Sequence, residues 1–349
     1  MNNFVTDKYI YRQNFMNAVT RAFNVSIYNS SNRVKFNKNS PYKGSPEDKE
    51  KILNILKDKF NCAVSKSSAA IGSKNLVYFS VFGVEFSLLL ELLLKSLVKF
   101  AKPFDFDILI ITDEVSRKAI LAIDELKEFN YDFHIVETPE DPVVASMYKL
   151  NIFDYRRINE YKNVLFLDAD IICFKNINFL FNKTDNTLDV VDNLYEKYKI
   201  EGSMNKQVIS AATLTHSVCY FLKEDKEYIE KEDPKVFNAG QFLFKNCQQM
   251  KIHFKNIIWI SKIWPSAYFY EQSFMNQYFV LNKLCWFETL APVTKLSLKI
   301  ISIKENIEDW EKIKHTENHA IMHFAGNSAN AKQKYMFIKR YLNHFSICL

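Results

Sequence analysis

Residues 163–172 read Asn163-Val-Leu-Phe-Leu-Asp-Ala-Asp-Ile-Ile172, a nearly unbroken apolar run that leads into two carboxylates, Asp168 and Asp170. Such a run is typical of a strand buried on both faces. Ionised carboxylates are costly away from water, so two of them after a buried strand favour a divalent cation as partner. In a continuing strand, side chains two residues apart point to one face. Their oxygens suit Mg²⁺ or Mn²⁺, at the strand end where open α/β sheets bind ligands.

The Asp-x-Asp triplet also has an ordinary interpretation. Such triplets occur by chance in loops and helix caps without a metal. The buried strand that precedes Asp168 supplies the context that a metal role requires, and it is this context that favours the metal interpretation.

Composition and charge restrict the class of protein. The chain has 349 residues, enough for one large or two ordinary domains, and a mild net charge of +6 that is no nucleic-acid signature. Its six cysteines are scattered and contain no Cys-x-x-Cys, which indicates core residues in a reducing compartment. The most apolar window, residues 86–98, is too short to span a bilayer and carries Glu91 and Lys95. With no signal-peptide core in residues 1–20, we expect a cytoplasmic protein without a transmembrane segment.

Strands and helices are expected to alternate from residue 75 onwards. The expected strands are residues 75–82, 106–112, 131–137 and a strand from residue 163 into Asp168, and the expected helices are residues 84–100, 116–129 and 145–158. This alternation predicts a parallel, doubly wound sheet. The chain has no Gly-x-Gly-x-x-Gly after the first strand and no Walker loop, which weighs against a dinucleotide dehydrogenase or a P-loop NTPase.

The second half of the chain is less regular. Residues 186–235 are charged and irregular, and residues 236–244 read as a strand interrupted at Asn238-Ala-Gly240, where the glycine predicts either a bulge or a close approach of the backbone to a ligand. Further helices are expected at residues 245–262, 270–279 and 330–345, and further strands at residues 284–288, 297–303 and 319–324. Residues 1–74 form a polar N-terminal extension, partly helical, with a helix predicted from Ser45 to about Phe60.

Three histidines, His315, His319 and His323, recur at a spacing of four. On a helix they would share one face and suit zinc. In the expected strand, however, His319 and His323 lie about 13 Å apart at roughly 3.3 Å per residue. At most one of them can then join the aspartates, and a structural histidine remains the common alternative.

Four segments now stand in a fixed order: Asp168-Ala-Asp170, Asn238-Ala-Gly240, Glu271-Gln272 with Asn276, and His323-Phe-Ala-Gly326. This order resembles the family 8 retaining glycosyltransferases, the group of glycogenin and the bacterial lipopolysaccharide galactosyltransferases. Lys149 stands where that family has a lysine ahead of its D-x-D motif. The resemblance covers about residues 75–340.

The resemblance implies an α/β GT-A fold, with a mostly parallel central sheet flanked by helices and a smaller acceptor-side sheet. Residues 75–349 would be one catalytic domain, with a nucleotide-sugar-binding half at 75–185 and an acceptor-side half at 186–349. It also implies a hexosyltransferase that uses Mn²⁺ (or Mg²⁺) to move a sugar from a UDP-sugar to an acceptor hydroxyl with retention.

The same resemblance assigns residues. Asp168, Asp170 and His323 would hold the metal, and Gln272, Glu271 and Asn238 would take part in catalysis. The donor would be bound by these residues: Phe79, Ser80, Val81, Lys149, Asp168, Ala169, Asp170, Asn238, Ala239, Gly240, Gly326 and Lys332.

Two departures from the family pattern matter. Glu271 stands where an aspartate is usual, and Ala329 stands where a lysine is usual, so that Lys332 or Lys334 would have to reach in from the following turn. These departures keep a second hypothesis open, a catalytically impaired protein of the same fold that binds a nucleotide sugar or a glycan.

Other classes fit less well. A sugar-nucleotide pyrophosphorylase would need a Gly-rich loop that Ser80-Val-Phe-Gly83 does not supply. A glycoside hydrolase, with two carboxylates about 5–10 Å apart, is not excluded. The acceptor (a glycan, a protein or a lipid-linked sugar) carries no readable code, and the sequence leaves a homodimer open.

Overall fold

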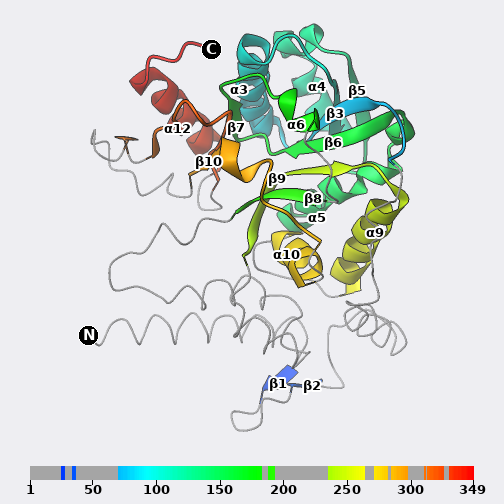
Figure 1. The fold of residues 1–349 in the computed structure, drawn as a ribbon. Coiled ribbons are helices and arrows are strands. Elements are labelled where there is room, and N and C mark those ends of the chain that lie inside the picture. The colour runs from blue at the N-terminus through cyan, green and yellow to red at the C-terminus, as the bar shows by residue number, and fades with distance from the viewer. Residues whose placement is uncertain are drawn as a thin grey trace, which may run out of the picture. The chain divides into compact units, whose positions relative to one another are not determined.

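The computed structural model describes residues 25–27, 34–36, 70–182, 188–192, 235–263, 271–281, 284–297, 310–311, 313–325 and 330–349 (Figure 1). The chain divides into two compact units, which are described separately. The sheet unit comprises Lys66–Val191, Ala239–Lys251 and Cys285–Leu349, and the second unit comprises Met1–Ser65, Asp192–Asn238 and Ile252–Leu284. Across the residues that the structure describes, no helix is both long and apolar enough to cross a membrane.

A six-stranded sheet in the order β5-β4-β3-β6-β9-β8 forms the centre of the sheet unit (Figure 1). Its strands are β3 (Lys74–Ser80), β4 (Asp107–Thr112), β5 (Tyr131–Ile135), β6 (Tyr161–Leu167), β8 (Leu188–Asp192) and β9 (Phe237–Lys245). The pairs among β5, β4, β3 and β6 are parallel, whereas β9 runs antiparallel to β6. Residues 76–79 and 164–167 are completely buried. The expected mostly parallel α/β sheet is confirmed.

Helix α3 (Val84–Phe100) has the bounds that the sequence predicts and contributes a row of buried leucines to the core. It packs against α4 (Glu114–Ile120), against β7 (Ile171–Cys173) and against α12 (Ala331–His344) (Figure 1). Asn330 caps α12 in a reciprocal capping box with Gln333. The expected C-terminal helix is therefore present as well.

Two expected helices are wrong in length. The helix predicted at 116–129 ends at Ile120 and gives way to a 3₁₀ helix, Asp124–Glu128. The buried residues of this segment, Ile120, Ile123, Leu126 and Phe129, recur every third residue, which is the 3₁₀ period. The helix predicted at 145–158 is α5 (Pro142–Met147) followed by 3₁₀ turns at Tyr148–Asp154 and Ile158–Glu160.

A second sheet has three strands in the order β10-β11-β7, with β10 at Thr294–Leu296 and β11 at Ile321–His323. The sequence predicts a strand that runs into Asp168, and β6 ends at Leu167. The chain turns at residues 168–170, so that β6 pairs with β3 and β9 while β7 pairs antiparallel with β11. Of the strand predicted at 284–288, the structure has a single bridge at Trp286. The strand predicted at 297–303 lies, after Ser297, outside the described residues.

Strand β9 is continuous, although an interruption was expected at residues 238–240. Its register with β6 runs without a shift from Leu167, which pairs with Gln241, to Asn163, which pairs with Lys245. The paired residues begin at Gln241, one residue after the glycine at which the sequence suggested a bulge.

The second unit contains most of α9 (Gln248–Ile263) and the whole of α10 (Glu271–Leu281). Asn276 on α10 accepts a hydrogen bond from the Phe237 amide and donates one to its carbonyl, at 2.7 and 2.8 Å. His253 is buried and contacts the Tyr278 hydroxyl at 3.1 Å. A short antiparallel pair, β1 (Val25–Ile27) with β2 (Val34–Phe36), lies in the N-terminal extension, and the helix expected at 45–60 lies outside the described residues.

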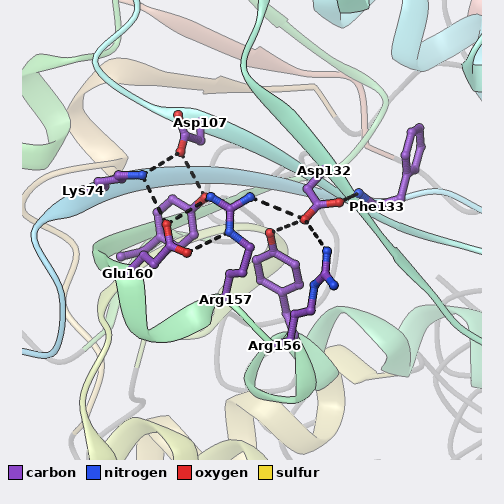
Figure 2. A network of polar contacts seen from close by, with 9 residues as sticks. Lys74, Asp107, Asp132, Phe133, Arg156, Arg157 and Glu160 are labelled. Carbon is purple, nitrogen blue, oxygen red and sulfur yellow. Dashed lines mark hydrogen bonds and ion pairs between the residues drawn. The ribbon is translucent and has the colours of Figure 1, made fainter.

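An ion-pair network joins the amino ends of the parallel strands (Figure 2). Glu160 is its centre, because Arg157 donates to both of its oxygens at 2.7 and 3.0 Å and Lys74 donates at 3.2 Å. These hydrogen bonds, chiefly that from Arg157, lower the pKa of Glu160 from about 4.5 to about 2. The network extends through Arg157 to Asp132 and through Lys74 to Asp107.

The lowered pKa of Glu160 predicts a pH-dependent contribution to stability. The carboxylate stabilises the fold fully above its ordinary pKa of about 4.5, and the contribution is lost as the pH falls towards 2. We expect E160Q to lower the urea midpoint at pH 7, with a difference from the wild type that shrinks at pH 4 and pH 3. E128Q, which removes a single exposed pair with Lys102, is the matched control and should change little. A difference that stayed constant over this pH range would contradict the prediction.

Candidate functional site

The turn between β6 and β7 presents the two aspartates. The Asp168 amide donates to the Gly240 carbonyl of β9 at 2.7 Å, and the Asp170 carbonyl accepts from the Phe324 amide, just after β11, at 3.0 Å. Because both ends of the turn are fixed by strands, the two carboxylates are fixed as well. Their convergence comes from a pinned turn and not from the pleat of one strand.

His323, the last residue of β11, completes the cluster. It pairs with Ile171 across the small sheet, which places it beside Asp170. Its Nε2 lies 3.1 Å from Asp170 Oδ1 and 3.9 Å from Asp168 Oδ2. One ligand atom from each of the three residues lies within 4.8 Å of the others.

Among the three spaced histidines, His323 alone reaches the aspartates. His315 stacks on Phe174 with ring centroids 3.8 Å apart, and His319 contacts Thr316. The prediction that at most one histidine would join the aspartates is therefore consistent with the geometry.

The residues present fit a divalent cation. The Asp170 and His323 side chains are only 8% and 3% exposed, whereas Asp168 is 33% exposed and leaves the cluster open on one side. Apart from its contact with the His323 ring, Asp170 Oδ1 is a buried oxygen with no hydrogen-bond partner among the described residues. A buried, unsatisfied carboxylate oxygen next to a second carboxylate and an imidazole is a donor set that suits Mn²⁺ or Mg²⁺.

Gly240 leaves room for this cluster. A Cβ atom on this residue would lie 2.1 Å from His323 Cε1 and 2.6 Å from Asp168 Oδ2. A close approach to the Gly240 backbone is thus observed, but it comes from the side chains of His323 and Asp168, and approach to a ligand stays a prediction.

Two lysines contact the carboxylates. Lys149, in the 3₁₀ turn Tyr148–Asp154, is 5% exposed at its side chain, and its Nζ lies 3.2 Å from Asp168 Oδ1 and 3.3 Å from the Ala239 carbonyl oxygen. Lys334 on α12 donates to Asp170 Oδ2. Burial alone would raise the pKa of Asp170, but Lys334 and His323 outweigh it and hold this pKa well below its usual range. The carboxylate therefore stays ionised.

Lys334 is the site residue that the sequence left undecided. Lys332 is exposed on the same helix, whereas Lys334, one turn after the Asn330 cap, points to Asp170. The helical period was the signal that distinguishes Lys334 from Lys332. Lys334 lies one turn after Asn330 and shares its face of the helix, whereas Lys332 does not.

The remaining predicted residues lie in several places. Phe79 and Val81 are buried at the end of β3, and Ser80 Oγ is a buried atom without a hydrogen-bond partner in the described part of the chain. Ala169 and Ala239 are buried beside the cluster.

The other predicted residues fall outside the sheet unit or outside the described residues. Asn238, Glu271 and Gln272 belong to the second unit, where Glu271 and Gln272 open α10, so their catalytic roles stay predictions. Gly326 lies outside the described residues.

Comparison with known proteins gives sequence relatives but no family model that matches. The chain is 30% identical over 147 residues to galactinol synthase 4 of Arabidopsis thaliana, which covers 39% of this chain and 38% of that protein. It is 28% identical over 173 residues to galactinol synthase 7 of the same plant, over 48% and 46% of the two chains. The matches therefore span less than half the length of these relatives.

A solved structure of the galactosyltransferase LgtC, in complex with donor and acceptor sugar analogues, has a similar fold. It aligns with a TM-score of 0.50 at 14% identity and covers 76% of this chain and 95% of LgtC. The similarity in sequence to galactinol synthases and the shared fold agree with the motif order Asp168-Ala-Asp170 to His323. The chain is thus similar to galactinol synthases over less than half of its length and has the GT-A fold of LgtC, in agreement with the resemblance to the family 8 glycosyltransferases.

Proposed function

We propose that this protein is a metal-dependent glycosyltransferase that moves a sugar from a UDP-sugar to an acceptor hydroxyl with retention of anomeric configuration. The observation that carries the proposal is the buried cluster of Asp168, Asp170 and His323 at the end of β6. In an open α/β sheet this is the position where ligands bind. Similarity to galactinol synthases supports the reaction class.

The cluster suits the chemistry of a departing nucleoside diphosphate. A bound divalent cation supplies Lewis-acid stabilisation of the negative charge that develops on the diphosphate. The chain's own residues keep that chemistry in place: Lys149 and Lys334 hold the carboxylates in fixed orientations, and burial of Asp170 and His323 excludes water from one side of the site. Fixed positive groups of this kind cost no reorganisation during reaction.

The donor is proposed to lie along the end of β3 and across β9. Phe79, Ser80 and Val81 would bind the nucleobase and ribose, and the partnerless Ser80 Oγ is a hydrogen-bonding group that a ligand can satisfy. Ala239 and Gly240 would line the sugar pocket, and Gly326 would let the backbone approach the diphosphate.

The catalytic roles of the second unit are part of the proposal. Gln272, Glu271 and Asn238 are proposed to take part in catalysis, with the Gln272 side-chain carbonyl oxygen stabilising the anomeric carbon as it becomes cationic. The donor to test first is UDP-galactose, because the names of both galactinol synthase and the galactosyltransferase LgtC refer to galactose.

A first prediction concerns UDP release from a panel of UDP-sugars. We expect release with Mn²⁺, none with EDTA, and a loss of at least about 100-fold in D170N, because amide substitution removes an ionised ligand from the metal. D124N, which changes an aspartate on the surface that pairs with Lys127, is the control and should keep full activity.

The same assay tests the alternative function. Metal-dependent binding of UDP without release from any donor, with or without candidate acceptors, would favour the impaired binding protein that Glu271 and Ala329 suggest. Failure of the wild type to bind UDP at all would contradict the transferase and a nucleotide-sugar-binding protein, and would leave only a glycan-binding protein.

A second prediction concerns Gly240. We expect G240A to displace the His323 ring, since the new Cβ would overlap it, and to lower Mn²⁺ affinity in the presence of UDP at least about tenfold. Calorimetric titration of Mn²⁺ measures the effect, and thermal melting gives its structural cost.

A double variant separates this overlap from a general loss of folding. In the H323A background the ring is gone, so G240A should lower the melting temperature less than it does in the wild type. An equal decrease in both backgrounds would show that the overlap with His323 is not the cause.

A further inference from the structure

The charges of the site are balanced by its own lysines. Within the ion pairs that the structure describes, Lys149 contacts Asp168 and Lys334 contacts Asp170. A neutral imidazole, the form that binds metals, adds no charge. The formal charges of these two described ion pairs, two carboxylates and two ammonium groups, thus sum to zero.

A divalent cation alone would upset this balance. It would leave two uncompensated positive charges in a cluster whose Asp170, His323 and Lys334 side chains are at most 13% exposed. Buried charge without a partner is strongly unfavourable. A diphosphate diester carries two negative charges, so the cation and the diphosphate together restore neutrality.

Of the two lysines, Lys334 is the one whose carboxylate partner, Asp170, would be shared with a cation bound to Asp170 and His323. Asp170 offers two oxygens: Oδ1 faces His323 Nε2 at 3.1 Å, and Oδ2 accepts from the Lys334 ammonium. A cation bound to Asp170 and His323 therefore shares one carboxylate with Lys334. Lys149 differs, because its contact is with Asp168, on the more exposed side, and it is also anchored by the Ala239 carbonyl.

We propose that Lys334 couples the metal to the nucleotide: it opposes binding of a divalent cation alone and favours binding of that cation together with a diphosphate. This inference rests on the proposed function and adds to it a rule of binding. Each ligand then raises the affinity for the other by the same factor, as thermodynamic linkage requires. The coupling protects the buried carboxylates from cations that arrive without a donor.

The test is Mn²⁺ affinity of the full chain, measured by electron paramagnetic resonance of free Mn²⁺, with and without UDP. We expect K334M to bind Mn²⁺ alone at least about tenfold more tightly than the wild type. We also expect the enhancement of Mn²⁺ affinity by UDP to fall at least about tenfold, which corresponds to about 1.4 kcal/mol of coupling. The opposite signs of these two effects distinguish Lys334 from a residue that only supports the helix.

Two controls accompany K334M. K339M makes the same substitution at an exposed position on the same helix and should change neither affinity. K334R keeps the positive charge and should keep the coupling. Methionine has a helix propensity close to that of lysine, so melting curves of K334M and K339M should agree closely enough to compare binding.

The outcomes separate the inference from the proposed function. If the wild type binds Mn²⁺ with UDP and K334M binds Mn²⁺ alone no more tightly than the wild type, the inference is overturned and the proposed function stands. Weaker Mn²⁺ binding by K334M in both conditions also overturns it, since Lys334 would then be a structural support. If the wild type binds no Mn²⁺ at any UDP concentration, the proposed function fails first.

Discussion

Two carboxylates and an imidazole within 4.8 Å of one another, two of the three groups buried, are the constraint on which this structure depends. Like charges at this separation repel, and burial increases the repulsion. The fold answers with a lysine for each carboxylate, from the turn before β6 and from the last helix. Ion pairs thus connect the carboxylates to the 3₁₀ turn that contains Lys149 and to helix α12. The interaction that holds Asp170 ionised also docks α12 at the site.

The smaller sheet explains how the cluster is assembled from distant segments. If β6 continued to residue 172, His323 would have no strand beside Asp170 on which to lie. The chain leaves the main sheet at residues 168–170 and continues as β7. Strand β7 pairs antiparallel with β11, and in this pairing His323 lies opposite Ile171. Gly240 on β9 then limits the crowding, because every larger side chain would meet His323. The turn, the small sheet and Gly240 therefore act together to place His323 beside the two aspartates.

Sequence reasoning located the residues of the cluster better than their geometry. The apolar run before Asp168, helix α3 and the order of motifs to His323 are strong local patterns, and the structure contains the elements that they predict. The strand was expected to run into Asp168, but the two carboxylates were expected to converge through the pleat of a continuing strand. A turn held by β9 and by the residue after β11 brings them together instead, and this change of partner strand is a tertiary effect. The 3₁₀ segment after Ile120 was missed because apolar residues at a spacing of three also occur in α-helices. Residues of the second unit, such as Gln272, stay predictions.

The charge balance of the site affects which ligands it can bind. A site of two aspartates alone would attract any divalent cation, and a site with lysines alone would attract any phosphate. The contact between Lys334 and Asp170 favours neither a cation nor a phosphate by itself. Either ligand must break this ion pair or add a charge that the pair does not compensate. Only a ligand pair with opposite charges meets both groups without leaving either uncompensated. Lys334 carries its charge from within the first turns of α12, a helix whose capping box fixes its start.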